Sequence, residues 1–486
     1  MTDGIAPQAA EPRTQTLETA VLLTATPAKR SARLHDGIGP WTALAGLTLF
    51  QRALLTLQRA GMTQVLVLAG DEERPLRKIL RRDQRITLTV RWMPVREFPL
   101  EDRRTWEALS GEAPGGCLVL GGTSVFSRQL VEHLRREARD GQDLLIVTPA
   151  GDRRQDAGPF GYVTSFDMLV LPAGWRMQAA QTEAVVGTVA EPSPIASDSP
   201  PGLSSLSPIR MVIRQAATDG RVRKVAAAPD SGAWHHMVRT PTEARRAEGT
   251  LIRSLKGEFE GLIDRYFNRY VSSLLTRGFL RLGLSPNAIT TLSLVIGLTS
   301  AAAFAVGNYA AGLIGALLFQ LAAIVDCCDG EVARVTFAES RFGAQLDLAT
   351  DNVVHMALFG GIGIGVFHQY AAGQGVIPTW GLSGLGAAWV PLGLGGAAMA
   401  GNALSFWLVN RAKARRERAT WMDPKQARRM QFLLKHVASR DFSVVILLFA
   451  LCNSLEGFLW LAAIGSNVFW MIVLAIARPF TSARSA

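Results

Sequence analysis

The chain has 486 residues, 19% of them charged, and a formal net charge of +11 at pH 7. This length exceeds that of one ordinary domain, so we expect two or three structural units. Many positive charges flank long apolar runs in the second part of the chain, which makes a nucleic-acid partner the weaker interpretation of the charge. The N-terminal stretch MTDGIAPQAAEPRTQ lacks the apolar core of a signal peptide, and we expect residues 1–16 to be disordered and the following domain to be cytoplasmic.

The first part of the chain alternates strand-like and helical patterns. Apolar runs predict strands at 19–25, 63–70, 86–90, 117–122 and 143–149, and a helical pattern covers 47–61. This alternation is typical of a parallel sheet with helices on its faces. We therefore expect a doubly wound, Rossmann-like α/β domain over residues 17–248, with an exposed Pro- and Ser-rich loop at 190–208.

Residues 249–284 alternate apolar and charged positions at helical spacing. The pattern predicts an amphipathic juxtamembrane helix that lies on the membrane surface. A connector helix packed on the soluble domain fits the same pattern. The sequence leaves both interpretations open.

Residues 285–486 contain six apolar spans, at 286–306, 308–328, 343–368, 385–409, 442–456 and 458–477. Several approach the roughly 20 residues that cross about 30 Å of hydrocarbon. Ser285 and Pro286 suit the cap and first turn of the first helix. Basic residues gather at 411–440, whereas 368–384 contain no Lys or Arg. The positive-inside rule thus predicts an all-α domain of six transmembrane helices in the cytoplasmic membrane, with both termini in the cytoplasm.

Four aspartates lie at the end of the second span and the start of the third. Asp326 and Asp329 are three residues apart, and Asp347 and Asp351 are four apart, so each pair lies on one helix face. A charge at the bilayer centre costs about 2.5–3.5 kcal/mol on insertion scales. Clustered carboxylates at such a place favour a hard divalent cation, Mg2+ or Mn2+, over the neighbouring arginines as partners.

The complete pattern from Asp326 to Asp351 is D-x2-D-G-x2-A-R-x8-G-x3-D-x3-D. It resembles the motif of the CDP-alcohol phosphotransferases, also called CDP-alcohol phosphatidyltransferases, and the resemblance extends over residues 285–477 with LSPNAITTLSL. The resemblance implies a membrane enzyme that transfers a substituted phosphate from a CDP-alcohol, such as CDP-diacylglycerol or a CDP-inositol-like donor, to an acceptor alcohol. CMP is released, in phospholipid or polar phosphodiester synthesis. A homodimer among membrane lipids is implied as well.

Carried over by position, the resemblance assigns roles to the motif residues. It implies two divalent ions, Mg2+ or Mn2+, held by Asp326, Asp329 and Asp347, with Asp351 as a further candidate ligand. Asp351 also resembles the general base that takes a proton from the acceptor hydroxyl. The CDP-binding positions that the resemblance implies are Asp329, Gly330, Ala333, Arg334 and Gly343.

The acceptor and the class of function retain alternatives. Arg341, Arg411 and Lys413 are candidates for binding an anionic acceptor, although the same charges also serve membrane topology and lipid headgroups. A transporter or a membrane scaffold would instead use the four aspartates as an ion pathway or a structural ion-pair network. Metal-dependent formation of CMP distinguishes a transferase from both.

The N-terminal domain resembles a second enzyme family. TLFQRALLTLQRAGMTQVLVLAG and WHHMVRTPTEARRAE are similar to the early part and the end of sugar-phosphate nucleotidyltransferases, and the whole chain resembles bifunctional inositol-phosphate cytidylyltransferase and CDP-inositol phosphotransferase proteins. Three features depart from the family. Residues 20–34 contain no glycine, residues 117–131 contain no acid, and Arg239 stands where the family has Asp. We expect a catalytically degenerate domain, with an active cytidylyltransferase as the alternative.

Overall fold

The computed structural model describes residues 17–24, 37–139, 143–148, 168–173, 175, 207–227, 232–254, 269–373, 385–418 and 442–477. The chain divides into two compact units, Met1–Ser254 and Leu255–Ala486. The helix α6, which ends at Ser254, crosses residue 248, where we expected the first domain to end. The segment 1–16 and residues 190–206 of the loop expected at 190–208 lie outside the described residues, whereas Ser207 and Pro208 begin the helix α5 (Ser207–Thr218) and are not loop.

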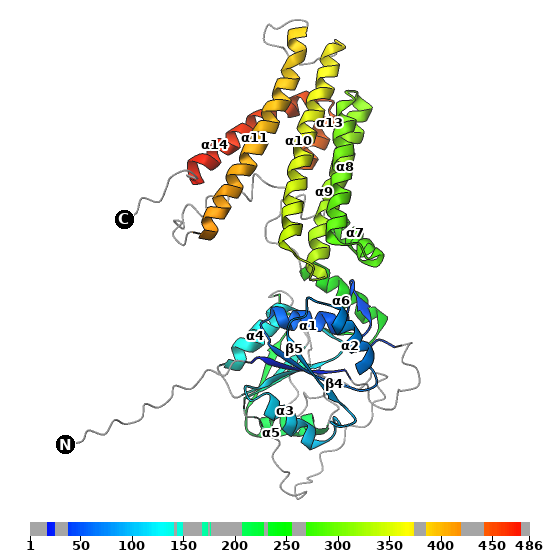
Figure 1. The fold of residues 1–486 in the computed structure, drawn as a ribbon, viewed down its shortest axis with the longest axis vertical. Coiled ribbons are helices and arrows are strands. Elements are labelled where there is room, and N and C mark those ends of the chain that lie inside the picture. The colour runs from blue at the N-terminus through cyan, green and yellow to red at the C-terminus, as the bar shows by residue number, and fades with distance from the viewer. Residues whose placement is uncertain are drawn as a thin grey trace, which may run out of the picture. The chain divides into compact units, whose positions relative to one another are not determined.

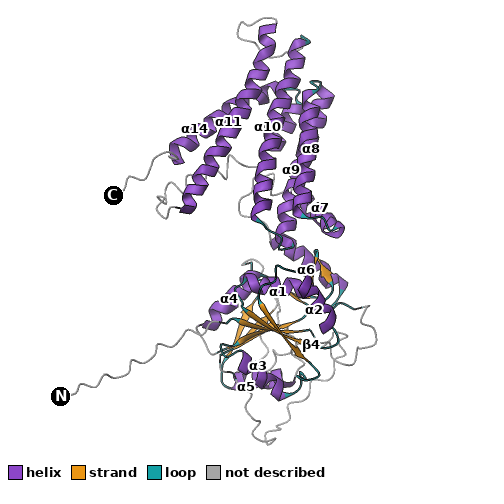
Figure 2. Ribbon diagram, in the orientation of Figure 1, coloured by secondary structure: helices purple, strands orange, loops and turns teal. Residues whose placement is uncertain are grey.

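The N-terminal unit is built on the sheet drawn in orange in Figure 2. This sheet has seven strands in the order β10-β8-β9-β6-β1-β4-β5. β9 pairs antiparallel with β6 and β8, and the remaining pairs are parallel. The α/β class is confirmed, but the sheet is mixed and not purely parallel. The strands are β1 Thr19–Leu23, β4 Gln64–Ala69, β5 Thr89–Pro94, β6 Cys117–Gly121, β8 Leu144–Thr148, β9 Met168–Leu171 and β10 Val222–Ala226.

Helices cover both faces of this sheet, with α1, α2, α4 and α6 on one side and α3 and α5 on the other (Figure 1). Each face has its own apolar core, the first centred on α1 and α4 and the second on Trp106 of α3. Two short ladders lie beside the sheet, β2 Ala43–Leu44 with β3 Leu47–Thr48 and β7 Ser124–Phe126 with β11 His235–Met237. The helices are α1 Leu49–Arg59, α2 Glu73–Arg82, α3 Arg103–Glu112, α4 Arg128–Arg139, α5 Ser207–Thr218 and α6 Pro241–Ser254.

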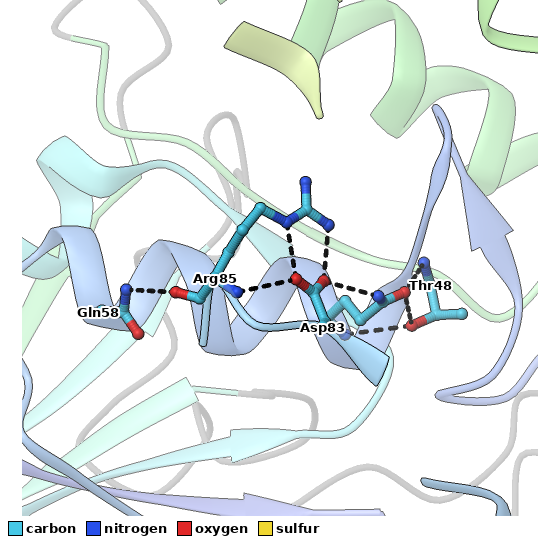
Figure 3. A network of polar contacts seen from close by, with 5 residues as sticks. Thr48, Gln58, Asp83 and Arg85 are labelled. Atoms are coloured by element: carbon cyan, nitrogen blue, oxygen red, sulfur yellow. Dashed lines mark hydrogen bonds and ion pairs between the residues drawn. The ribbon is translucent and has the colours of Figure 1, made fainter. Parts of the chain in front are cut away.

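A polar network fastens α1 to the turn that follows α2 (Figure 3). Thr48 and Gln51 form a capping box at the start of α1, which satisfies two backbone N–H groups that the helix leaves without partners. The Gln51 side chain also donates to Asp83 Oδ2 at 2.8 Å, and Arg85 donates to both Asp83 oxygens at 2.7 and 2.6 Å. Gln58 donates to the Arg85 carbonyl oxygen at 2.9 Å.

This network predicts a pH-dependent contribution of Asp83 to stability. The hydrogen bond from Arg85 holds the pKa of the Asp83 carboxyl below its ordinary value of 3.8. A carboxyl whose pKa is lowered by folding stabilises the fold above its unfolded pKa, and this stabilisation is lost as the pH falls through the folded pKa. We expect Asp83→Asn to destabilise the unit by about 1–3 kcal/mol at pH 7, and by progressively less below about pH 4.

Hydrogen exchange of the α1 amides in the full chain, followed from pH 7 to pH 3.5 after correction for intrinsic rates, measures this effect. Exposed Asp102, whose side chain caps α3 by accepting a hydrogen bond from the Arg104 N–H at 2.9 Å, provides the control position, and Asp102→Asn should leave exchange in α1 unchanged. Equal protection of α1 in the wild type and in Asp83→Asn at pH 7 would contradict the prediction.

The membrane unit contains five described helices that are long and apolar enough to cross a bilayer. The run expected at 442–456 is divided, because Asn453 adopts a φ of 52° and separates α13 from α14. The described part of α13 has 10 residues, about 15 Å at 1.5 Å per residue, so the expected count of six spans is not confirmed. The helices are α7 Arg269–Leu282, α8 Pro286–Ala305, α9 Tyr309–Val335, α10 Arg341–Ala371, α11 Leu385–Arg418, α13 Phe442–Leu451 and α14 Leu455–Ala477.

Caps and glycines fix how these helices pack. The Ser285 hydroxyl accepts a hydrogen bond from the Ala288 N–H, with Pro286 in the first turn of α8, as the sequence predicted. A Cβ atom at Gly361 would overlap a backbone carbonyl of α8, and one at Gly365 would do the same one turn later. Close backbone approach of this kind is typical of small residues at membrane helix interfaces. It holds α10 against α8, and both helices contribute to the site below.

Candidate metal and phosphate site

Three carboxylates from two helices converge in the membrane unit. One oxygen from each of Asp326 and Asp329 of α9 and Asp347 of α10 lies within 4.8 Å of the other two. Asp326 and Asp329 are only 7% and 6% exposed, and Asp347 is half-buried. Three negative charges this close repel one another strongly away from water. A divalent cation would offset this repulsion, and carboxylate oxygens are the ligands that hard divalent cations prefer.

The connection between α9 and α10 explains the convergence. α9 ends at Val335 and α10 begins at Arg341, so a short turn reverses the chain between the two acidic pairs. Phe337 adopts a φ of 57° in this turn. The Ser340 hydroxyl then caps α10 by accepting a hydrogen bond from the Gly343 N–H at 2.9 Å. The sequence spacing placed each pair on one helix face, and the turn brings the two faces together.

Asp351 occupies a different place from the other three aspartates. It lies one turn after Asp347 on α10, is half-buried, and is outside the group of three defined by the 4.8 Å separation. One turn further on, His355 packs edge-on against Phe319 and Phe442, with ring centroids 6.1 and 5.8 Å apart. Asp351 is thus beside the cluster, on the side where the apolar interior of the helix bundle begins.

Thr290 of α8 belongs to the site, although the sequence analysis assigned it no role. Its hydroxyl is hydrogen-bonded to Asp329 Oδ2, and the residue is buried. Asn287, three residues earlier and on the same side of α8, lies close to Gly343 at the start of α10. The polar pair at i and i+3 inside PNAIT was the available signal, since these positions share one helix face.

The small residues of the motif make room for polar groups. A Cβ atom at Gly330 would lie 3.2 Å from Arg334 Nη1, because the Arg334 side chain folds back over Gly330. A Cβ atom at Gly343 would lie 3.2 Å from Asn287 Oδ1. Ala333 is half-buried on the same helix as Arg334. The arrangement places the Arg334 guanidinium over Gly330 and polar side chains of Ser340 and Asn287 beside Gly343.

The candidate acceptor residues lie at the ends of helices. Arg341 is exposed at the first residue of α10. Arg411 is exposed on α11, with its guanidinium carbon 5.4 Å from the centroid of the Trp407 ring. Lys413 lies two residues further along α11, and its side chain is outside the described set. Their contact with an acceptor remains a prediction.

In the N-terminal unit, residues 117–131, which contain no acid, include β6 and the loop that follows it at Gly122. The Gly122 N–H donates to the Leu23 carbonyl oxygen at 2.7 Å, and a Cβ atom at Gly122 would lie 2.9 Å from that oxygen. The Val238 N–H donates to the Thr123 carbonyl oxygen at 3.1 Å, which brings the following residue, Arg239, to the same loop. Backbone contacts therefore exclude a side chain at Gly122. The residue near this loop that stands where the similar family has Asp is the cationic Arg239.

Residues 283–473 match the family described as CDP-alcohol phosphatidyltransferase. The match lies within the membrane unit and covers less than half of the chain. The residues matched include all eight positions of the aspartate motif and Thr290. This match confirms the resemblance that the sequence analysis placed over residues 285–477.

Individual relatives match smaller parts of the chain. It is 34% identical over 128 residues to the bifunctional IPC transferase and DIPP synthase of Aquifex aeolicus, which covers 26% of this chain and 29% of that protein. The chain therefore matches less than a third of that relative's length.

Two solved structures are similar at low sequence identity. The first is the phosphatidylinositol phosphate synthase of Mycobacterium tuberculosis in complex with manganese and citrate, at 20% identity and a TM-score of 0.32, over 44% of this chain and 93% of that one. The second is a putative glucose-1-phosphate thymidylyltransferase of Bacillus anthracis, at 10% identity and a TM-score of 0.34, over 48% of this chain and 94% of that one. At these TM-scores the similarities carry no functional information.

Proposed function

We propose that the membrane unit transfers a substituted phosphate group from a CDP-linked alcohol to the hydroxyl of an acceptor alcohol and releases CMP. The observation that carries this proposal is the convergence of Asp326, Asp329 and Asp347 inside a CDP-alcohol phosphatidyltransferase domain. The donor is CDP-diacylglycerol or a polar CDP-alcohol of the CDP-inositol kind. The product is accordingly a phospholipid or a polar phosphodiester.

The three carboxylates fit one or two Mg2+ or Mn2+ ions. Two of them are buried, all three are oxygen donors, and their mutual repulsion is relieved by a divalent cation. When bound, such cations neutralise the diphosphate of the donor and make CMP a better leaving group. In the proposed site, Thr290 holds the Asp329 carboxylate in place, and the Arg334 guanidinium is available to donate hydrogen bonds to phosphate oxygens.

The proposed reaction is a single displacement at phosphorus. The acceptor oxygen attacks the phosphorus that bears the transferred alcohol, and the bond from this phosphorus to the oxygen bridging the two phosphates breaks. CMP leaves with that bridging oxygen and its electron pair. We assign Asp351, one turn beyond Asp347, as the base that accepts the proton of the attacking hydroxyl.

We also propose the membrane placement and assembly that the sequence predicted. The chain is integral to the cytoplasmic membrane, with both termini in the cytoplasm, which requires an even number of crossings. Small residues at 393–401 allow close helix contact, and the proposed state is a homodimer surrounded by membrane lipids. The basic stretch at 411–440 supports a cytoplasmic location of that connection.

Replacement of the proposed base tests the function. Purified protein supplied with CDP-diacylglycerol or CDP-inositol, candidate alcohols and Mg2+ should form CMP, and mass spectrometry should identify the acceptor that gains the phosphate. We expect Asp351→Asn to lower the rate by about 10²–10⁴-fold, the usual contribution of a general base, with the fold retained. No CMP from the wild type with any donor, or an unchanged rate in Asp351→Asn, would refute the transferase or the base assignment respectively.

We propose that the N-terminal unit is structural or regulatory, because residues 20–34 contain no glycine, residues 117–131 contain no acid, and Arg239 stands where the similar family has Asp. Metal-assisted nucleotidyl transfer should then be absent. The full chain, incubated with CTP, inositol phosphate and Mg2+, is expected to release no pyrophosphate above the level without enzyme. CTP-dependent release of pyrophosphate would instead support a bifunctional enzyme.

A further inference from the structure

Glu331 is a buried carboxylate on the same helix as Asp326 and Asp329, and it has partners of its own. It is 5% exposed. One carboxylate oxygen, Oε1, accepts a hydrogen bond from Ser272 Oγ at 3.0 Å, and the other, Oε2, accepts one from Thr276 Oγ1 at 2.7 Å. Ser272 and Thr276 are buried one turn apart on α7. Both oxygens of the carboxylate are therefore bound by hydroxyl groups of a neighbouring helix.

The position of Glu331 on α9 separates it from the proposed metal ligands. At about 100° of rotation per residue, Glu331 points roughly 160° away from Asp329 and 140° away from Asp326. Around the helix axis, Cys328 lies between Glu331 and Asp329 and nearer to Glu331. Its thiol donates to the Ser272 carbonyl oxygen at 3.5 Å. α7 thus packs on the back of α9, while the aspartates occupy the front.

The C-terminal part of α9 is contacted on two sides by one short stretch of the chain, residues 272–290. α7 ends at Leu282, Gly283 turns the chain with a φ of 67°, and Ser285 caps α8. Thr290 of α8 then reaches the Asp329 carboxylate on the front of α9. The hydroxyls of residues 272–290 therefore contact one carboxylate on each side of the helix that carries two of the three clustered aspartates.

The energetics indicate a role in positioning. Burial of a carboxylate away from water carries a desolvation cost of several kcal/mol, which hydrogen bonds offset in part. Apolar residues of similar volume would pack α7 on α9 without that cost. Apolar surfaces, however, allow a helix to rotate or slide, whereas a carboxylate bound by two hydroxyls defines both the rotation and the register of the contact.

We propose that Glu331 is a positioning residue for the metal site. Through its hydrogen bonds to Ser272 and Thr276, it fixes the rotation of the cytoplasmic end of α9 and so aims Asp326 and Asp329 at the point where Asp347 lies. This proposal rests on the proposed function, since it assumes that the three aspartates bind divalent cations. It assigns α7 the task of supporting the site from behind.

The test is direct binding of Mn2+ to the full-length protein in detergent, measured by electron paramagnetic resonance without substrate. Removal of a group that orients metal ligands typically weakens metal affinity by 10- to 100-fold. We expect Glu331→Ala to raise the dissociation constant for Mn2+ by about tenfold or more. Thr276→Val, which keeps the side-chain volume, should also raise the dissociation constant for Mn2+. Glu331→Gln, which retains an oxygen acceptor, should bind Mn2+ with an affinity within about threefold of the wild type.

Ser300→Ala provides the matched control. Ser300 is buried on α8, and its hydroxyl donates to the Gly315 carbonyl oxygen of α9 at 2.7 Å. Its removal breaks a buried hydrogen bond between membrane helices that lies many residues from the aspartates, so Mn2+ affinity should stay unchanged. An equal loss of affinity in Ser300→Ala would show general loosening of the bundle and would overturn the proposal.

The other outcomes separate this proposal from the proposed function. Unchanged Mn2+ affinity in both Glu331→Ala and Thr276→Val overturns the positioning role, and if Glu331→Ala does not fold, Thr276→Val decides. If the wild type binds Mn2+ but releases no CMP, the proposed transferase activity is refuted. The Mn2+ affinities of the Glu331 and Thr276 variants then still decide whether Glu331 positions the metal site. A wild type that binds no Mn2+ refutes both.

Discussion

The Asp329→Asn variant should lose metal-dependent CMP release by about 10³-fold or more, equivalent to about 4 kcal/mol of transition-state stabilisation. Asp329 is one of two buried carboxylates in the cluster and is held by Thr290. The amide has almost the same shape but carries no charge, so the variant removes one anionic ligand from a site of three. Initial rates of CMP formation over a range of Mg2+ concentrations measure the loss.

Two comparisons make this result specific to the site. Asp83→Asn, in the N-terminal unit, is the same chemical change and should leave the rate of CMP formation unchanged. Thr290→Val should lower the rate less than Asp329→Asn, because it removes one hydrogen bond to the ligand but leaves the ligand in place. If Asp329→Asn forms CMP at a rate within tenfold of the wild type at the same Mg2+ concentrations, this carboxylate is not an essential ligand.

Gly365→Ala is expected to disrupt the membrane unit, although it adds only one methyl group. A Cβ atom at Gly365 would overlap the backbone carbonyl oxygen of Phe304 on α8, and a backbone atom cannot move aside as the end of a flexible side chain can. Overpacking of this kind costs typically 1–3 kcal/mol. The two helices should separate locally, which lowers both the melting temperature and the rate of CMP release.

Gly360→Ala on the same helix is the control for this prediction. Its new methyl group would lie 3.4 Å from the sulfur of Met399, a flexible side chain at ordinary contact distance. Melting temperatures of the two variants in the same detergent, with the rates measured alongside, give the comparison. If the melting temperature of Gly365→Ala equals those of Gly360→Ala and the wild type, the tight contact of α8 with α10 is not required for stability.

The sequence predicted much of the fold because buried strands consist mainly of apolar residues, which the sequence shows directly. The runs TAVLL and CLVLG are fully buried central strands, and strands buried on both faces appear as continuous apolar runs. β10 was missed because Arg223 and Lys224 interrupt its apolar pattern. β9 was missed because it is only four residues long, and its antiparallel pairing depends on the path of the chain outside the strand.

The candidate site was predictable where it depends on spacing along one helix and unpredictable where it depends on contacts between helices. Two pairs of aspartates at three and four residues predicted shared faces, and three of the four carboxylates do meet. Thr290 contacts a residue 39 positions away, and Ser272 contacts one 59 positions away. Partners at such separations follow from the packing of α7, α8 and α9, which no local pattern records.

Manganese-edge anomalous diffraction from crystals of the full-length chain grown with Mn2+ tests the central claim most directly, because it locates the metal independently of activity. We predict one or two strong peaks within bonding distance of carboxylate oxygens from Asp326, Asp329 and Asp347. Peaks only elsewhere, or an ordered aspartate cluster without any manganese at saturating concentration, would contradict the account.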